Sequence, residues 1–379
     1  MSAPAPRGAA AGEGTRAPLL ARWRQALRRR RAIVGGASLP ALIYRWDLDK
    51  TYLKSDFESL RKMMWVPFER AQDKVDEPGV VALIRALKAS ARAEGRSAWV
   101  YFISASPPQI GRAIREKLAL DGIDADGIVF KNQLQHLMRG RFRYLREQVG
   151  FKLAELLKAR LEAPADAVEY LFGDDWESDS IIYSLYADLA AGNLEPEKLG
   201  DVLVRLRIDP ARLVEIKALA ARLTSRDVVR RVFINLERRT PPGQFRAFGP
   251  RLVPTFNYFQ TALVLYQEGV LPLDAVIAVG RSLIERSAYT PEQLRNSLDD
   301  LLRRGHLAAQ TESVRRDLRE ARVLPLDGVL GSWPRRLWRR LWRRFDGRRA
   351  MPRPVGGHVD YTRLLDGWLA NGGRPGDAA

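Results

Sequence analysis

The sequence contains no cysteine and only three histidines among its 379 residues. The absence of cysteine excludes a disulfide framework and a thiolate metal site. The three histidines, His136, His306 and His358, are far apart in the sequence, which argues against a histidine-rich metal site or a Ser-His-Asp triad. Any catalysis is therefore expected to depend on carboxylates, hydroxyls and lysines.

Long apolar runs are also missing. No run approaches the roughly 18 residues that a membrane span requires. The N-terminal region has no apolar stretch between its arginines and Pro40, which argues against a secretory signal. We therefore expect a cytoplasmic protein, either free in the cytoplasm or bound peripherally to the inner face of the membrane.

Positive charge is abundant and unevenly placed. The formal net charge is +18. Residues 1–37 carry eight arginines against one glutamate, and residues 331–350 carry eight arginines against one aspartate. Two segments near the ends of the chain thus account for +14, while the remainder is nearly balanced. This pattern indicates an acidic surface as a partner.

Apolar segments alternate in kind between residues 38 and 192. Strands are predicted over 41–48, 98–106, 127–131 and 168–175, and helices over 78–95, 107–122, 151–161 and 178–192. Such alternation is typical of a parallel α/β sheet. Residues 195–321 look helical throughout, with a capping box predicted at Thr290 and Gln293.

The predicted organisation has five parts. They are a disordered basic tail (1–37), an α/β domain (38–192), an all-α domain (193–325), a basic amphipathic helix (331–346) and a mostly disordered tail (347–379).

Polar side chains follow three of the predicted strands. Asp47 lies at the end of the first predicted strand, and Asp49 and Thr51 follow it, in the stretch RWDLDKTYL. Ser104 ends the second strand, and Asp174 ends the last. Ligands bind beyond the carboxyl ends of the strands in an open parallel sheet. We therefore expect these side chains to converge.

The chemistry of these residues fits phosphoryl transfer. Asp47 and Asp174 supply oxygen ligands of the kind that Mg²⁺ prefers. Asp47 can attack phosphorus, while Asp49 protonates the leaving oxygen and later deprotonates the attacking water. Ser104 and a lysine would hold the phosphoryl oxygens, and Thr51 is taken as a further residue on the phosphate side.

The stretch RWDLDKTYL has two other interpretations. A calcium-binding loop would use positions one, three, five and twelve, which are Asp47, Asp49, Thr51 and Glu58. That loop needs glycine at position six for a sharp turn, where this chain has Tyr52. An ordinary polar turn is the other alternative. The matching chemistry at the other strand ends favours phosphoryl transfer over both.

Four motifs in this order resemble the haloacid dehalogenase (HAD) superfamily of phosphohydrolases. They are DLDKT at 47–51, FISAS at 102–106, the lysine of VGFKLAELL, and GDDWESD at 173–179. More narrowly, residues 38–190 resemble the catalytic domain of the actin-patch type phosphatidate phosphatases. The chain departs from that family's pattern at Lys50, where the family has a third aspartate, and at Pro108, where it has tryptophan.

The resemblance implies a HAD-like (Rossmannoid) parallel sheet, Mg²⁺ as cofactor, and removal of phosphate from a phospholipid such as phosphatidate. It assigns Asp47 as the nucleophile and Asp49 as the acid and base. It assigns Ser104 and a helix-opening Lys152 as phosphate holders. It assigns the metal to Asp47, Asp49, Asp174 and Asp179.

Two further residues are candidate phosphate contacts. Lys131, at the end of the predicted strand GIVFK, is an alternative to Lys152. Ser106 either caps the following helix or binds phosphate alongside the backbone amides there.

Residues 333–345 read WPRRLWRRLWRRF. On a helix, the apolar residues, including Trp333, Trp338 and Trp342, share one face, and arginines such as Arg339 and Arg343 fill the other. A tryptophan face opposite an arginine face is typical of binding to an anionic membrane. Docking on the protein's own body and binding to nucleic acid are the alternatives.

We therefore expect a Mg²⁺-dependent phosphatase that acts on a membrane phospholipid. A HAD phosphatase for nucleotide or nucleic-acid phosphate is the alternative within enzymes. A non-catalytic, membrane-associated interaction protein is the alternative outside them. No obligate protein partner is evident.

Overall fold

The computed structural model describes residues 39–49, 51–52, 76–104, 110–130, 141–176, 178–308, 312–326 and 359–370. Several predictions fall outside these residues. They concern the N-terminal tail, Ser106, Lys131, and the Trp–Arg segment with Trp333, Trp338, Trp342, Arg339 and Arg343.

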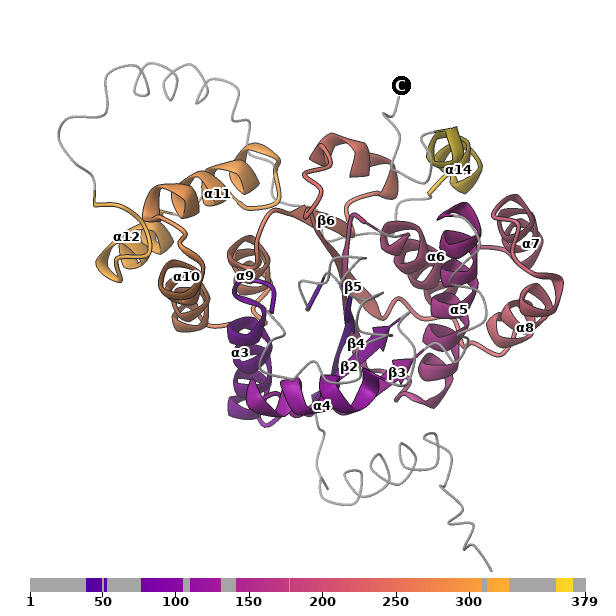
Figure 1. Ribbon diagram of the computed structural model, residues 1–379, viewed down its shortest axis with the longest axis horizontal. Coiled ribbons are helices and arrows are strands. Elements are labelled where there is room, and N and C mark those ends of the chain that lie inside the picture. The colour runs from indigo at the N-terminus through magenta and orange to yellow at the C-terminus, as the bar shows by residue number, and fades with distance from the viewer. Residues whose placement is uncertain are drawn as a thin grey trace, which may run out of the picture. The chain divides into compact units, whose positions relative to one another are not determined.

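A six-stranded parallel sheet forms the centre of the fold (Figure 1). The strands are β1 (Leu42–Asp47), β2 (Ala98–Ser104), β3 (Gly127–Phe130), β4 (Val168–Asp174), β5 (Val229–Asn235) and β6 (Leu252–Thr255). Their order is β3-β2-β1-β4-β5-β6, and every neighbouring pair is parallel. The first four strands read as nearly continuous apolar runs because both faces of a parallel sheet are buried. The α/β prediction is thus confirmed, and all four predicted strands are present.

The prediction that residues 193–325 are all-α is wrong, because β5 and β6 lie within this range and extend the same sheet. The sheet therefore continues across the boundary predicted at residue 192. Residues Leu39–Ala379 belong to one compact unit.

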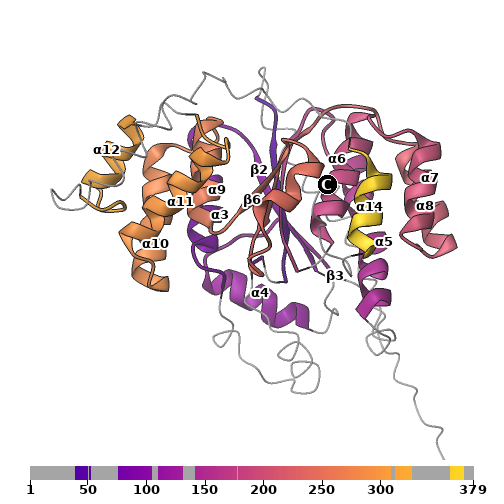
Figure 2. The same ribbon diagram turned by 90° about the horizontal axis from the view of Figure 1, so that it is seen from above.

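Helices cover both faces of the sheet, as Figures 1 and 2 show. The apolar core on one face includes residues of α3 (Val80–Ala93), α4 (Gly111–Leu120), α9 (Tyr258–Gln267), α10 (Leu273–Ser287), α11 (Pro291–Arg303) and α12 (Glu312–Glu320). The core on the other face includes residues of α5 (Arg141–Glu162), α6 (Asp179–Ala191), α7 (Pro196–Arg205), α8 (Pro210–Ala220), the 3-10 helix η4 (Pro242–Phe248) and α14 (Tyr361–Ala370). The two apolar cores are separate layers, one on each side of the strands.

A row of aromatic rings crosses the middle strands. Trp46 on β1 stacks on Phe172 of β4 with ring centroids 3.8 Å apart, and Phe172 lies 5.3 Å from Phe233 of β5. Aromatic pairs on adjacent strands stabilise one pairing register over its neighbours. The row therefore helps to hold the carboxyl ends of β1, β4 and β5 level with one another.

The C-terminal tail, predicted to be mostly disordered, contains α14. Val359, Tyr361 and Leu365 of this region are buried in the second core. The Tyr361 hydroxyl donates to Asp188 Oδ2 at 2.5 Å. An apolar spacing of four residues, from Tyr361 to Leu365, makes a single helical stripe that the core accepts.

The predicted capping box at the start of α11 is confirmed, since Thr290 Oγ1 and Gln293 Oε1 each accept from the other residue's backbone amide. Among the described residues, no helix combines the length and the apolar character needed to cross a bilayer.

Candidate functional site

The strand order changes direction between β1 and β4. The chain proceeds from β1 to β2 and β3 on one side, then returns to place β4, β5 and β6 on the other. In doubly wound sheets, the crevice at such a switch point is where ligands bind. Asp47 is the last residue of β1 and Asp174 the last of β4, so two carboxylates lie at this point.

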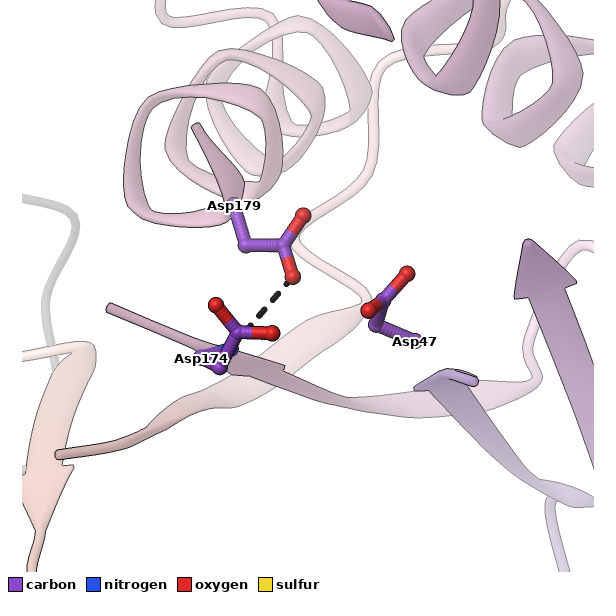
Figure 3. A group of neighbouring side chains, drawn as sticks. All are labelled: Asp47, Asp174 and Asp179. Carbon is purple, nitrogen blue, oxygen red and sulfur yellow. Dashed lines mark hydrogen bonds between the residues drawn. The ribbon is translucent and has the colours of Figure 1, made fainter. Parts of the chain in front are cut away.

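Three buried carboxylates meet there. Asp47, Asp174 and Asp179 each offer an oxygen, and these oxygens all lie within 4.8 Å of one another. Figure 3 shows the three side chains converging, with the Asp174 backbone N–H donating to Asp179 Oδ2 at 3.4 Å. All three residues are 0% exposed. The carboxylates at the ends of the first and last predicted strands, Asp47 and Asp174, therefore converge as predicted, and Asp179 joins them.

Lys152 lies against this group from α5. Its Nζ is 2.7 Å from Asp47 Oδ1 and 2.7 Å from Asp179 Oδ1, and the side chain is fully buried. The sequence motif implied a lysine that opens a helix, and this detail is wrong. Helix α5 begins at Arg141, because residues 141–150 are helical and do not form a loop before the lysine. Lys152 therefore lies in the middle of the helix.

Gly173 makes room for the carboxylates. A Cβ at this position would lie 2.4 Å from Asp179 Oδ2 and 2.6 Å from Asp179 Cβ. Any larger residue would therefore displace Asp179. The glycine of the GDDWESD motif thus has a steric reason to stand beside Asp174.

The remaining predicted residues surround the carboxylates. Ser104 Oγ donates to Asp49 Oδ2 at 2.7 Å, and Thr51 Oγ1 donates to Asp174 Oδ2 at 3.4 Å. All of these side chains are buried. Asp49 was predicted as a metal ligand, but it is not one of the three grouped carboxylates.

Asp175 connects the site to the next strand. Its carboxylate accepts the backbone N–H groups of Arg238 and Thr240, at 2.9 and 3.1 Å. This holds the turn that follows β5 against the end of β4. The role was not anticipated, because the sequence analysis did not recognise β5.

Tyr258 is a second residue that the sequence analysis missed. It lies at the start of α9, and its hydroxyl donates to the backbone carbonyl of Thr51. Burial, with a further contribution from the Glu77 carboxylate, raises the pKa of Tyr258 well above its ordinary value. The hydroxyl therefore stays protonated and remains a donor to the DLDKT loop.

The residues present fit a divalent cation with oxygen ligands. Three carboxylates without solvent exposure gather their oxygens here, and the Lys152 ammonium pairs with two of them. Mg²⁺ is held by carboxylate oxygens at about 2.0–2.1 Å, with opposite ligands about 4 Å apart. Oxygens that all lie within 4.8 Å of one another are compatible with that spacing, so Asp47, Asp174 and Asp179 are the candidate ligands.

Comparisons with protein-family models and with curated proteins find no match for this chain.

Proposed function

We propose that this protein is a Mg²⁺-dependent phosphomonoester hydrolase of the HAD type that works through an aspartyl-phosphate. The observation that carries the proposal is the buried group of Asp47, Asp174 and Asp179 with Lys152, at the switch point of a parallel sheet. Buried ionisable groups that gather in one cluster at a ligand-binding edge of a sheet are typical of functional sites. The motifs at 47–51 and 173–179 support the same assignment.

In the first step, an Asp47 oxygen forms a bond to phosphorus as the bond between phosphorus and the ester oxygen breaks. Asp49 gives its proton to the departing oxygen. In the second step, a water oxygen bonds to phosphorus, Asp49 takes the proton of that water, and the bond from phosphorus to Asp47 breaks. Inorganic phosphate leaves and both carboxyl groups return to their starting states.

The other side chains position the carboxylates and offset the charge on the phosphoryl group. Lys152, placed between Asp47 and Asp179, supplies an ammonium for the phosphoryl oxygens. Ser104 orients Asp49 through its hydrogen bond, and Thr51 does the same for Asp174. When bound, Mg²⁺ would offset the negative charge that gathers on the phosphoryl group.

The basic terminal segments support a membrane phospholipid, such as phosphatidate, as the source of the phosphate. In this proposal the Trp–Arg segment brings the protein to an anionic membrane surface, on the inner face. The HAD phosphatase for nucleic-acid phosphate and the non-catalytic interaction protein remain the competing proposals. Intact Asp47, Asp49 and Asp174 favour an enzyme.

The direct test compares the full chain with its Asp47→Asn variant. Phosphate release from phenyl phosphate in the presence of Mg²⁺ is expected from the wild type. A loss of at least about 10³-fold is expected for Asp47→Asn, because an amide is not a nucleophile at phosphorus. Chelation of Mg²⁺ should abolish the activity as well. Equal release by wild type and variant would refute the proposal.

A further inference from the structure

A cavity of about 550 Å³ lies beside the proposed site, at the carboxyl ends of β5 and β6. Its wall includes Asn235, the last residue of β5, and Tyr258, at the start of α9. The volume is in the range of pockets that hold small molecules. The sequence motifs assigned no catalytic or binding role to any residue of the cavity wall.

The cavity wall is connected to the carboxylate group in three ways. Asn235 is the register partner of Asp174 on the neighbouring strand. The Tyr258 hydroxyl donates to the Thr51 carbonyl. Asp175, next to Asp174 in sequence, holds the turn that contains Arg239, another wall residue. Neighbouring strands lie about 5 Å apart, so β5 is about 10 Å from β1 and its nucleophile. That distance suits the leaving group of a substrate whose phosphate sits at Asp47.

One buried polar group on the wall has no partner. Asn235 is 8% exposed, and its Oδ1 accepts no hydrogen bond from any described residue. Leaving a buried amide oxygen without a donor costs free energy that a ligand can recover. The end of β5 therefore presents an unused acceptor to the cavity.

The rest of the wall divides into fixed and available groups. Asn257, Gln260 and Ser297 bond to one another, and Asp300 pairs with Arg304 at 2.7 Å. These bonds make a rigid side. Within the described part of the chain, the side chains of Ser287, Tyr289 and Asn296 have no hydrogen-bond partner, like the Asn235 oxygen.

The available groups identify the chemistry of the ligand. Amides and hydroxyls both donate and accept hydrogen bonds, as alcohol hydroxyls do. The wall carries carboxylates on Glu77, Glu237 and Asp300 and a guanidinium on Arg239, and Asp300 is paired with Arg304. Hydroxyls can donate to carboxylates and accept from a guanidinium, so a polyol can use both kinds of group. Acyl chains could satisfy none of the polar groups, and an ammonium, which only donates, could not satisfy the donors of Arg239 and Asn296.

The turn after β5 is also held in an unusual conformation. Arg239 has a φ of 58°, a left-handed value that costs about 1 kcal/mol or more for a residue other than glycine. Asp175 maintains it by accepting the flanking amides. A strained residue that lines a cavity is a feature of ligand-binding sites.

We propose that this cavity binds the leaving group of the substrate, and that this leaving group is a polyol. The inference rests on the proposed phosphatase function and narrows it to phosphomonoesters of hydroxyl-rich compounds. Such a polyol can be a soluble compound or the headgroup of a phospholipid. Phosphatidate, whose leaving group is a diacylglycerol, becomes the comparison substrate.

The test measures phosphate release by the full chain with Mg²⁺ from four substrates. They are inositol 1-phosphate, vesicles containing phosphatidylinositol 4-phosphate, vesicles containing phosphatidate, and phenyl phosphate. We expect kcat/KM for at least one of the two polyol substrates to exceed that for phenyl phosphate and for phosphatidate by about tenfold or more. The comparison of the soluble and vesicle arms identifies the source of the polyol.

Two cavity variants, Asn235→Ala and Asn296→Ala, are compared with Asn193→Ala. Asn296 and Asn193 are both exposed, but Asn193 lies at the end of α6, outside the cavity. The ratio of kcat/KM for the polyol substrate to that for phenyl phosphate should fall about tenfold in each cavity variant, mainly through KM. The ratio should be unchanged in Asn193→Ala. Asn296 is on a helix surface, so its variant stays informative if Asn235→Ala does not fold.

The possible failures are distinguishable. Hydrolysis of phenyl phosphate that depends on Asp47, without preference for a polyol, overturns this inference and leaves the proposed function standing. A preference for phosphatidate, or ratios unaffected by both cavity variants, also overturns it. Absence of phosphate release from every substrate overturns the proposed function, and the inference falls with it.

Discussion

At the scale of single residues, the site is an arrangement of charges without solvent. Asp47, Asp179 and Lys152 are all 0% exposed, and one ammonium lies 2.7 Å from an oxygen of each carboxylate. Each of these ions depends on the others, because an unpaired charge in a protein interior is strongly unfavourable. Asp174 adds a third carboxylate to the group. The three carboxylates therefore form a candidate site for a divalent cation.

The variant Lys152→Met tests this dependence. It should lower the free energy of unfolding by about 3–5 kcal/mol, because two buried carboxylates lose their shared partner. Saturating Mg²⁺ should restore part of that loss, because a divalent cation bound to Asp47, Asp174 and Asp179 replaces the missing charge. Denaturant unfolding with and without Mg²⁺ gives both quantities.

A matched control lies in the same helix. Lys158 pairs with Glu155 and Glu215 on the surface, with its side chain 33% exposed. Lys158→Met should cost no more than about 1 kcal/mol and show no added response to Mg²⁺. Similar losses in the two variants would contradict the special role of the Lys152 cluster. A loss in Lys152→Met that Mg²⁺ does not reduce would contradict the metal site.

At the scale of elements, the strands differ in how well they could be predicted. The first four are mainly apolar, with Arg45 in β1 and Glu169 in β4 as single charged interruptions, and they have polar residues at their ends. Both the strands and the site at their ends therefore followed from the pattern. Strand β5 was missed because Arg230 and Arg231 interrupt its apolar run. The Arg231 guanidinium is nevertheless buried, because it pairs with Glu268 and donates to the Pro250 carbonyl.

Strand β6 was missed for a different reason. It has four residues and includes Pro254, which argues against a central strand. As the edge strand of the sheet, it can accommodate proline. Because β5 and β6 were unrecognised, Asn235 and Tyr258 could not be placed beside the site from the sequence. Their positions depend on packing between residues far apart in the chain.

The end of α11 offers a prediction on pH. His306 follows this helix, and burial, with the neighbouring Arg304 and Arg231, lowers its pKa from 6.5 to about 4, while Asp300 opposes the shift. Because the unfolded chain takes up a proton near pH 6.5 and the folded chain does not, folding becomes less favourable as the pH falls from about 6.5 to about 4. Between pH 7.5 and 5 this group should cost up to about 2 kcal/mol.

Denaturant unfolding of wild type and His306→Gln over this pH range checks the expectation. The variant should lose about 2 kcal/mol less than the wild type between pH 7.5 and 5. The other two histidines and the carboxyl groups are common to both proteins, so their titration cancels in the comparison. Parallel curves for the two proteins would show that His306 titrates alike in the folded and unfolded chains.

At the scale of the whole molecule, the chain is anchored on both sides of the Trp–Arg segment. Before it, Val314 and Leu318 of α12 are buried in the first core. After it, α14 is fixed by Tyr361 on Asp188 and by an ion pair between Arg205 and Asp366 at 2.7 Å. Residues 331–346 are therefore joined to the folded protein at both ends, so any surface that they bind is held close to it.

The last prediction concerns what that segment binds. Full-length protein should float with vesicles that contain phosphatidylserine, and rising salt should weaken the association because it screens the arginines. Arg339→Gln with Arg343→Gln should reduce affinity about 10- to 30-fold, at about 1 kcal/mol for each charge. Replacing Trp333, Trp338 and Trp342 with serine should abolish flotation, because the apolar face supplies the insertion into the membrane. If the partner is nucleic acid, the protein should bind duplex DNA, and this binding should survive the tryptophan changes. If the segment docks on the protein itself, the wild type should not float, and the tryptophan variant should have a lower midpoint of thermal unfolding than the wild type.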